Sequence, residues 1–423
     1  MASVFVIDMR ARLGDQRINI QQSIGMMGRL TILKFELENM SKTTATTMSS
    51  KSVTGIFWRV FFPASIFAFV CAPVHAQSSV TLYGIVAEGI GYITNQGGKS
   101  VVGMYNGLLQ NSRFGIRGKE DLGGGNSAIF LLENGFSVTT GALSSGKLFG
   151  RQAWVGLSND KFGKITLGRQ YDEMSQQLWW SEASTQFATA IATHIGDLDN
   201  IFNTTRLDNS IRYASRDYDG FTFAGQYAFS NSTAFSDNSG YSLGANYVRG
   251  SLTAGVAMVQ LLHPASSNTG GAVGDTYGFT SPFTQSLSGS SVDSQRNVAA
   301  AVTYDFGWAT TGLSYSNVLF NYQNSTGLRL QNVEFMAYRH LTRTLLVGVG
   351  YDYTFGSYST GQAIHYNQIN LGAIYSLSKR TDLFLAAIYQ RAGGAAKHAQ
   401  LYSLSPSSSR SIAEVATGIR VKF

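Results

Sequence analysis

Residues 411–423 read Ser-Ile-Ala-Glu-Val-Ala-Thr-Gly-Ile-Arg-Val-Lys-Phe, and this closing stretch decides the fold. Counting back from the last residue, every second position is mostly apolar: Phe423, Val421, Ile419, Thr417 and Val415. The positions between them are small or charged: Lys422, Arg420, Gly418, Ala416 and Glu414. Because successive side chains of a strand point to opposite faces, this alternation predicts a β-strand with one apolar and one polar face.

The same alternation recurs about sixteen times along the chain. The predicted strands cover 79–93, 108–121, 125–138, 147–158, 163–172, 207–217, 220–230, 240–249, 251–262, 295–305, 307–318, 330–341, 344–356, 365–378, 381–392 and 411–423. Most are close to the roughly 9–11 residues that a tilted strand needs to cross a bilayer. A high content of Gly, Tyr and Phe with only 5 Pro favours a large antiparallel β structure.

The connections between these strands alternate in length. Tight turns fall at 121–125, 159–161, 217–220, 249–251, 305–307, 341–343 and 378–381, and longer polar stretches fall at 95–106, 139–146, 173–206, 231–239, 263–294, 319–329, 357–364 and 393–410. Short turns at one end and long loops at the other are typical of transmembrane barrels. We therefore expect an all-β, 16-stranded antiparallel transmembrane β-barrel. The core face of a soluble barrel is the alternative, and the sorted loops argue against it.

The N-terminal region reads as a secretory leader. A basic start at Lys51 and Arg59 precedes an apolar run over 60–71, and Val74-His75-Ala76 matches a cleavage site. We expect residues 48–76 to be the signal peptide and 77–423 to be the barrel. Residues 1–47 are then a gene-model extension, with Met48 or Met40 as the true start. A natural, unusually long n-region is the alternative.

Several short segments, in this order and spacing, carry a family resemblance: 80–84 (VTLYG), 112–118 (SRFGIRG), 120–125 (EDLGGG), 148–157 (LFGRQAWVGL), 166–172 (TLGRQYD), 209–213 (NSIRY), 377–382 (LSKRTD) and the terminal Phe423. Together they resemble the trimeric general porins of Gram-negative outer membranes, closest to the beta-proteobacterial branch. The resemblance covers essentially all of 77–423. It implies a multi-pass outer-membrane barrel, a homotrimer, and a passive diffusion channel for ions and small hydrophilic solutes with weak charge selectivity.

In such porins the third extracellular loop folds inward and narrows the pore, and here that loop matches 173–206. By the same resemblance, Arg113, Arg151 and Arg212 are expected to form a basic wall at this constriction. An arginine is always charged, and a charge in mid-strand of a membrane barrel belongs on the lumen side. The alternative is that these arginines only pair with inward carboxylates and hold the loop.

Other charged residues are expected to line the constriction as well. Arg117, Lys119 and Arg169 are further basic candidates by alternation or position, and Asp197 and Asp199 are the acidic candidates on the loop. The two aspartates could equally be solvated loop residues. Many porins carry a lysine shortly after the first Leu-Tyr-Gly, where this chain has Ile85. That departure weakens the basic side and puts strong anion selectivity in doubt.

Phe423 resembles the signal that the barrel-assembly machinery reads, so that machinery and outer-membrane lipids are expected partners. No enzymatic activity, cofactor, metal or nucleic-acid partner is expected. A near match to a phosphate-binding loop ends at Leu148, where Ser or Thr is required, and the Gly240–Gly244 match to a nucleophile elbow opens a predicted strand. Two functional alternatives stay open: a substrate-specific channel for organic acids, amino acids or sugars, and a surface protein with a plugged lumen.

Overall fold

The computed structural model describes residues 78–274, 277–278 and 281–423. The predicted extension and leader therefore lie outside the described residues. Its strands are β1 (Ser79–Gln96), β2 (Lys99–Asn106), β3 (Arg113–Gly123), β4 (Asn126–Gly135), β5 (Gln152–Asn159), β6 (Gly163–Tyr171), β7 (Arg206–Ala214), β8 (Phe221–Ala228), β9 (Ser239–Arg249), β10 (Leu252–Leu262), β11 (Val292–Asp305), β12 (Thr310–Tyr322), β13 (Gly327–His340), β14 (Leu345–Tyr358), β15 (Ala363–Ser376), β16 (Thr381–Gly394) and β17 (Ser411–Lys422). A short 3-10 helix, η1 (Ser144–Gly146), lies between β4 and β5.

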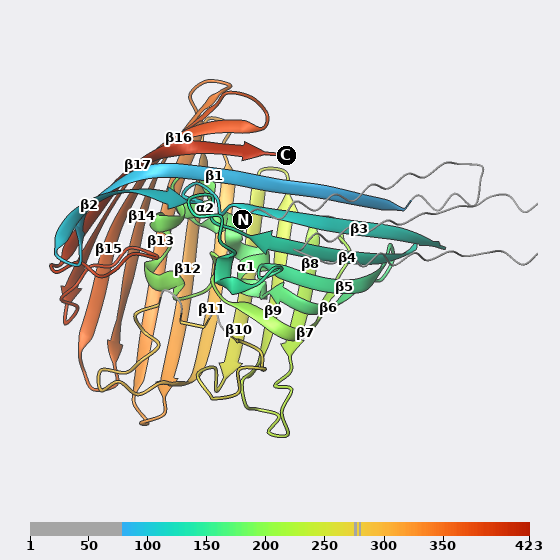
Figure 1. Ribbon diagram of the computed structural model, residues 1–423, viewed down its shortest axis with the longest axis horizontal. Coiled ribbons are helices and arrows are strands. Elements are labelled where there is room, and N and C mark those ends of the chain that lie inside the picture. The colour runs from blue at the N-terminus through green and yellow to red at the C-terminus, as the bar shows by residue number, and fades with distance from the viewer. Residues whose placement is uncertain (1–77, 275–276, 279–280) are drawn as a thin grey trace, which may run out of the picture. The chain divides into compact units, whose positions relative to one another are not determined.

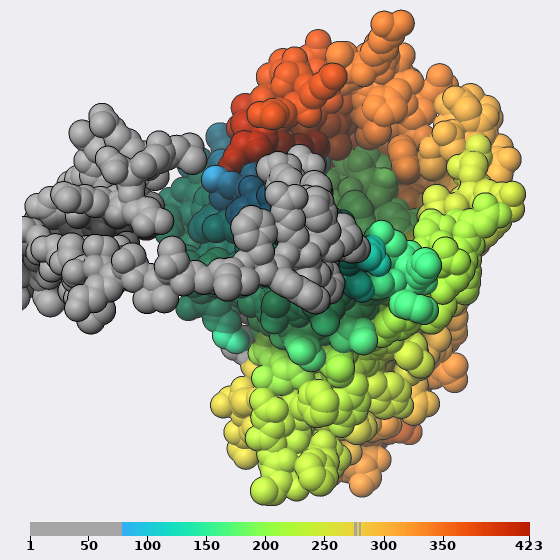
Figure 2. Space-filling view, turned by 90° about the vertical axis from the view of Figure 1, so that its right-hand side faces the viewer, coloured from blue at the N-terminus to red at the C-terminus, as the bar shows by residue number. Residues whose placement is uncertain are grey.

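The strands close into a barrel (Figure 1). From β3 to β17 each strand pairs antiparallel with the next one in sequence, and β1 pairs with β17, with Gly89 opposite Gly418. Figure 2 shows the N-terminal strand in blue against the C-terminal residues in red. Strand β1 also pairs with β2 through residues 88–96 and with β3 through 79–85, so β2 and β3 are two parts of one strand. The seventeen segments of the described residues thus form the 16-stranded antiparallel barrel that the alternation predicts.

Some strands extend further than the sequence predicts. The expected loop at 95–106 is mostly strand β2, and the connections β12–β13 and β14–β15 are only 323–326 and 359–362. The physical reason is that apolar residues alternate through these polar stretches. Phe320, Tyr322 and Leu328 are all buried and pack into the interior core, which favours continued strand pairing there.

The two faces of β17 follow the predicted alternation. Val415 and Phe423 are 48% and 50% exposed, whereas Glu414 and Ala416 on the opposite face are each 1% exposed. Exposed aromatic side chains also gather at the β11–β12 turn, where Tyr304, Phe306 and Trp308 contact one another. An outward apolar surface with aromatic residues near its edge is typical of a membrane barrel. Within the described residues, no helix has the length and apolar character needed to span a bilayer.

The connection between β6 and β7 folds into the barrel. It contains α1 (Glu173–Leu178), η2 (Trp179–Ser181), α2 (Ala183–Gln186), η3 (Ala190–Ala192) and η4 (Ile195–Asp197). Most of its side chains are buried, including Leu178, Phe187 and Ile195. We call residues 172–205 the constriction loop. Its apolar side chains join those of the surrounding strands in the main hydrophobic core.

Candidate functional site

The constriction loop is attached to the inner wall from β7 round to β17. Hydrogen bonds join loop residues to partners in other parts of the barrel. Glu173 binds Arg212 and Ser242, Ala183 N binds Glu334, Thr189 binds Glu414, and Ala190 N binds Leu108 O. Further along the loop, Ala192 O binds Gln368, Leu198 O binds Gln295, Asp199 binds Ser316 and Thr204 binds Tyr402. Most of these partners come from β9 and later strands. The loop therefore leaves the wall of β1 and β3–β6 facing open space.

Glycines on the lumen face make room for the loop. A Cβ at Gly348 would lie 2.3 Å from the Phe187 ring, and one at Gly372 would lie 2.0 Å from the Phe187 carbonyl oxygen. A Cβ at Gly255 would lie 2.8 Å from the Leu178 side chain. Real Cβ atoms do not approach this closely. Gly348 and Gly372 therefore leave no room for a side chain while the loop is docked, whereas at Gly255 the end of the Leu178 side chain would have to move.

Between the loop and the open wall lies a cavity of about 400 Å³, which we call the constriction cavity. Its wall side comprises Tyr83, Ile85, Leu109, Gln110, Asn111, Arg113, Glu133, Arg151, Gln152 and Tyr171, and its loop side comprises Ser175, Gln176, Trp179, Ser184, Thr185, Phe202 and Asn203. The charged lining residues are Arg113, Arg151 and Glu133. The loop side has polar and aromatic side chains but no charged one.

Glu133 organises the basic wall. Its carboxylate accepts a 2.8 Å hydrogen bond from Arg151 Nε and another of 2.8 Å from the Tyr83 hydroxyl, and Arg113 Nε lies 3.9 Å away. Two arginines on one carboxylate leave an excess positive charge at the cavity. The structure therefore brings the predicted Arg113 and Arg151 together.

The predicted Arg212 lies elsewhere. Its Nε and Nη2 donate to the two carboxylate oxygens of Glu173, at 2.6 and 3.0 Å, and both side chains are buried. This bidentate pair fixes the start of α1 to β7. Arg212 thus holds the loop, which is the alternative that the sequence left open for the arginines.

The other basic candidates take different places. Arg169 binds Asp208 and donates to Gly150 O at 2.8 Å, outside the lining of the constriction cavity. Arg117 and Lys119 are exposed on β3, and the Arg117 guanidinium lies 5.6 Å from the centre of the Tyr83 ring. They share a strand face with Arg113, so they extend the basic strip towards the short-turn end.

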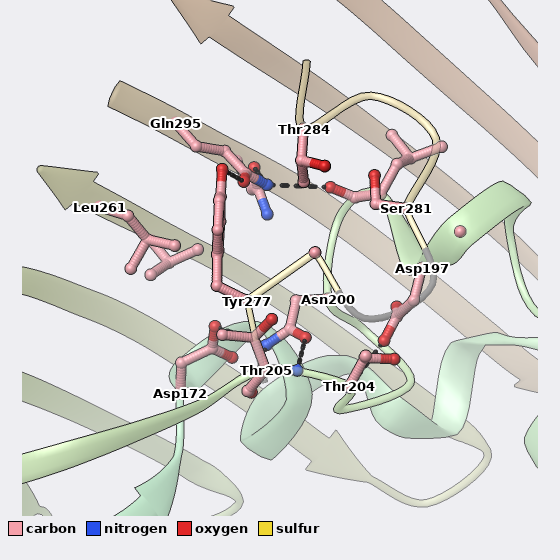
Figure 3. A pocket seen from close by; sticks show the side chains of 15 residues that line it. Asp172, Asp197, Asn200, Thr204, Thr205, Leu261, Tyr277, Ser281, Thr284 and Gln295 are labelled. Carbon is pink, nitrogen blue, oxygen red and sulfur yellow. Dashed lines mark hydrogen bonds between the residues drawn. The ribbon is translucent and has the colours of Figure 1, made fainter. Parts of the chain in front are cut away.

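Asp197 and Asp199 face the loop and the wall behind it. Asp197 accepts hydrogen bonds from the backbone amides of Phe202 and Thr204, at 3.1 and 2.8 Å, and Figure 3 shows it beside Thr204. Asp199 binds His194 and Ser316, at 2.9 and 2.5 Å. Both carboxylates are used in closing and docking the loop, and neither lines the constriction cavity.

A small void lies between the end of the constriction loop, strands β10 and β11, and the segment that contains Tyr277 and Thr284. Figure 3 shows Asp172, Asn200 and Thr205 gathered there, and the void holds about 30 Å³, room for about one water. Asp172 accepts from Ser175 N at 3.1 Å and from Asn200 Nδ2 at 2.9 Å. Burial raises the pKa of Asp172 to about 7 and that of Asp197 to about 6.

Sequence reasoning missed three residues in or next to the site: Glu133, Tyr83 and Arg206. The sequence favours Trp179 as an anchor of the loop to the wall, with stacking on aromatic solutes as the alternative. Tyr83 on β1 and Glu133 on β4 both face the lumen. The two-residue alternation along each of these strands could have indicated them. Arg206 lies 5.4 Å from the centre of the Tyr171 ring and donates to Thr204 O at 2.6 Å. Trp179 is 47% exposed and lines the constriction cavity.

Phe423 closes the barrel. Its backbone amide and carbonyl form two 3.0 Å hydrogen bonds with Gly84, and its ring covers that residue. A Cβ at Gly84 would lie 2.3 Å from the ring, so the glycine of the Leu-Tyr-Gly segment provides the space. Ser242, in the segment that matches a nucleophile elbow, lies within β9; it accepts from Glu173 N and donates to Met258 O, both at 2.8 Å.

Comparison with known proteins agrees with this architecture. The sequence model described as Gram-negative porin matches residues 64–395. An outer membrane porin protein of Bordetella pertussis is 29% identical over 383 residues, which are 79% of this chain and 94% of that protein.

Two solved structures show the same fold. The anion-selective porin from Comamonas acidovorans superposes with a TM-score of 0.67 at 23% identity, covering 82% of this chain and all of that one. The trimer form of in-vitro folded OmpT from Vibrio cholerae gives a TM-score of 0.61 at 16% identity, covering 82% and 99%. Because the family match spans well over half of a chain that closes into a 16-stranded barrel, this chain belongs to the Gram-negative porin family of outer-membrane channels.

Proposed function

We propose that the chain is a general diffusion porin that passes ions and small hydrophilic solutes through the constriction cavity, with a weak preference for anions. The observation that supports this most directly is the unequal charge of that cavity. Two arginines and one glutamate line it, and the loop opposite contributes no charged side chain. Fixed charges around a narrow aqueous passage set the sign of the ions it favours.

The preference is weak for two reasons. Glu133 offsets one of the two arginines, and Ile85 lines the cavity where many relatives are expected to carry a lysine. Arg117 and Lys119 add positive charge along β3 and attract anions towards the passage. Arg169 and Arg212 contribute less, because Asp208 and Glu173 accompany them.

The assembly is proposed to be a homotrimer in the outer membrane, as in the trimer form of the Vibrio cholerae protein. Phe423 is proposed to be read by the barrel-assembly machinery, which its position at the end of the closing strand supports. No enzymatic role is proposed. Ser242 is engaged by backbone groups on two sides, and it serves as an anchor for α1 rather than as a nucleophile.

Single-channel recording in planar bilayers tests the proposal. The purified protein should give large stepwise conductances, often in threes, and a reversal potential across a KCl gradient whose sign indicates anion preference. A correctly folded, heat-modifiable barrel that gives no conductance would contradict the channel. A cation preference would contradict the assignment of Arg113 and Arg151.

A channel with preference for organic acids is the second candidate, and Trp179 supports it. Its indole is half exposed in the cavity that also holds Arg113 and Arg151. A basic group opposite an aromatic face suits a planar carboxylate. Liposome swelling with benzoate and with an uncharged sugar separates the candidates. Faster benzoate entry that is lost in Trp179→Ala supports specificity, and equal loss for both solutes supports general diffusion.

A further inference from the structure

Where the constriction loop packs against β13, away from the constriction cavity, several buried carboxylates surround the imidazole of His194. His194 Nδ1 is 2.9 Å from Asp199 Oδ2 and 3.3 Å from Glu182 Oε1, and His194 Nε2 is 3.1 Å from Glu334 Oε2 on β13. All four side chains are at most 1% exposed. Asp352 on β14 is also buried and interacts electrostatically with His194.

This group contains more carboxylates than positively charged partners. With Asp197 it holds five carboxylates, and the ion pairs that these five make within the described residues involve only His194. An isolated carboxylate is costly to remove from water, so such a group must hold either extra protons or a cation. Glu182 Oε1 is buried and has no hydrogen-bond donor. That oxygen points to His194 and is available to a cation.

The three nearest donors match a transition-metal ion. The donor atoms of Glu182, His194 and Asp199 all lie within 4.8 Å of one another. Tetrahedral Zn²⁺ with ligands at roughly 2.0–2.1 Å separates them by about 3.3 Å. The Glu182–His194 distance already equals this, and the Asp199–His194 distance is about 0.4 Å shorter. Both distances to His194 are thus within a few tenths of an ångström of those in a tetrahedral site, and the Glu182 and Asp199 oxygens lie within 4.8 Å of each other.

Glu334 supplies the outer partner that such a histidine requires. With the proton on Nε2, His194 donates to Glu334, and the Nδ1 lone pair then faces Glu182 and Asp199. Metal-bound histidines almost always donate their other N–H to a carboxylate or carbonyl, which fixes ring orientation and raises basicity. Glu334 is itself held by Ala183 N at 3.0 Å.

We propose that Glu182, His194 and Asp199 bind one divalent transition-metal ion, Zn²⁺ by its donor set, with Glu334 as the outer partner of the histidine. The ion joins two parts of the constriction loop. Through Ser316 and Glu334 it also ties the loop to β12 and β13. It thereby acts as a clamp that keeps the loop docked, and its binding does not depend on which solutes the pore passes.

The test uses protein extracted from outer membranes, stripped with a chelator and titrated with ZnCl₂ at neutral pH. Metal analysis should find one Zn²⁺ per chain, and Co²⁺ in its place should give the visible absorption of a tetrahedral site. His194→Gln should lose the ion, whereas His263→Gln, which alters an exposed His–Asp pair, should retain it. Glu334→Gln keeps all three ligands and should weaken binding by about 10- to 100-fold.

The result that overturns the proposal is a folded wild-type barrel that binds no Zn²⁺, or a His194→Gln protein that binds it as tightly as the wild type. If His194→Gln does not yield a heat-modifiable barrel, Glu334→Gln and the Co²⁺ spectrum decide. Unchanged affinity in Glu334→Gln rules out Glu334 as the outer partner, and a Co²⁺ spectrum without tetrahedral bands means that the site does not form and the acids are balanced by protons instead.

Discussion

Neutralising Glu133 should make the channel more selective for anions. The Glu133→Gln change removes the one negative charge that lines the constriction cavity and keeps an acceptor for Tyr83. A cavity of about 400 Å³ has the volume of a sphere of radius roughly 4.6 Å, so an ion at its centre lies roughly 6 Å from the carboxylate.

The magnitude follows from Coulomb's law. One unit charge at that distance in water is worth about 0.7 kcal/mol, and screening at 0.1 M salt reduces it to about 0.4 kcal/mol. The change favours anions and disfavours cations by the same amount, so the chloride-to-potassium permeability ratio should rise about 3- to 4-fold.

The assay is the reversal potential of single channels across a KCl gradient at 0.1 M mean salt. Asp305→Asn is the matched control, because Asp305 is exposed at the β11–β12 turn and does not line the cavity. It should leave the ratio unchanged. A Glu133→Gln channel with unchanged selectivity, or with a shift towards cations, would refute the view that this cavity filters ions.

Four further outcomes test the loop and the closure. Arg212→Ala leaves the buried Glu173 carboxylate without its cation, at a cost of about 3–5 kcal/mol, so recordings should show frequent substates; the double change with Glu173→Gln should restore steady channels. Gly372→Val should likewise displace the loop, since its Cβ would overlap a loop carbonyl, and a conductance histogram identical to the wild type would speak against this. Deleting Phe423 should lower the amount of heat-modifiable barrel in outer membranes, with normal amounts as the contrary result. Burial raises the pKa of Asp172 to about 7, above its unfolded value, so protonation of this carboxyl favours the folded state. The stability that this group contributes should therefore fall as the pH rises from about 4 to 7. Asp172→Asn should flatten the pH dependence of the melting temperature over this range.

The fold could be predicted from the sequence because a membrane barrel repeats one local rule. Alternation along each strand and turn residues between strands, as at Asp217–Gly220, depend on neighbours in sequence. The exceptions also have local causes. The wall strand is interrupted at 107–112 between β2 and β3, and apolar residues such as Phe320 and Leu328 extend strands into stretches that look polar.

The site was harder to predict because its geometry depends on contacts between residues that are far apart in the sequence. Arg212 and Arg206 stand six residues apart, yet a register shift in β6–β7 separates them, with Asn209 at φ 50°. The simple rule that every second residue faces the lumen therefore fails across this irregularity, and it cannot assign the faces of both arginines. Asp197 looked like a pore acid because it is charged and lies in the loop, whereas its role is set by backbone amides that only the folded loop presents.

The attachment of the constriction loop has a consequence for the order in which the protein is built. Most of the groups that hold it, from Ser242 on β9 to Tyr402 before β17, come later in the chain than the loop itself. When an unfinished chain has only its first strands in place, the loop has almost no surface on which to settle. The loop can therefore dock fully only once these later strands have formed, so the narrowing of the passage depends on completion of the barrel.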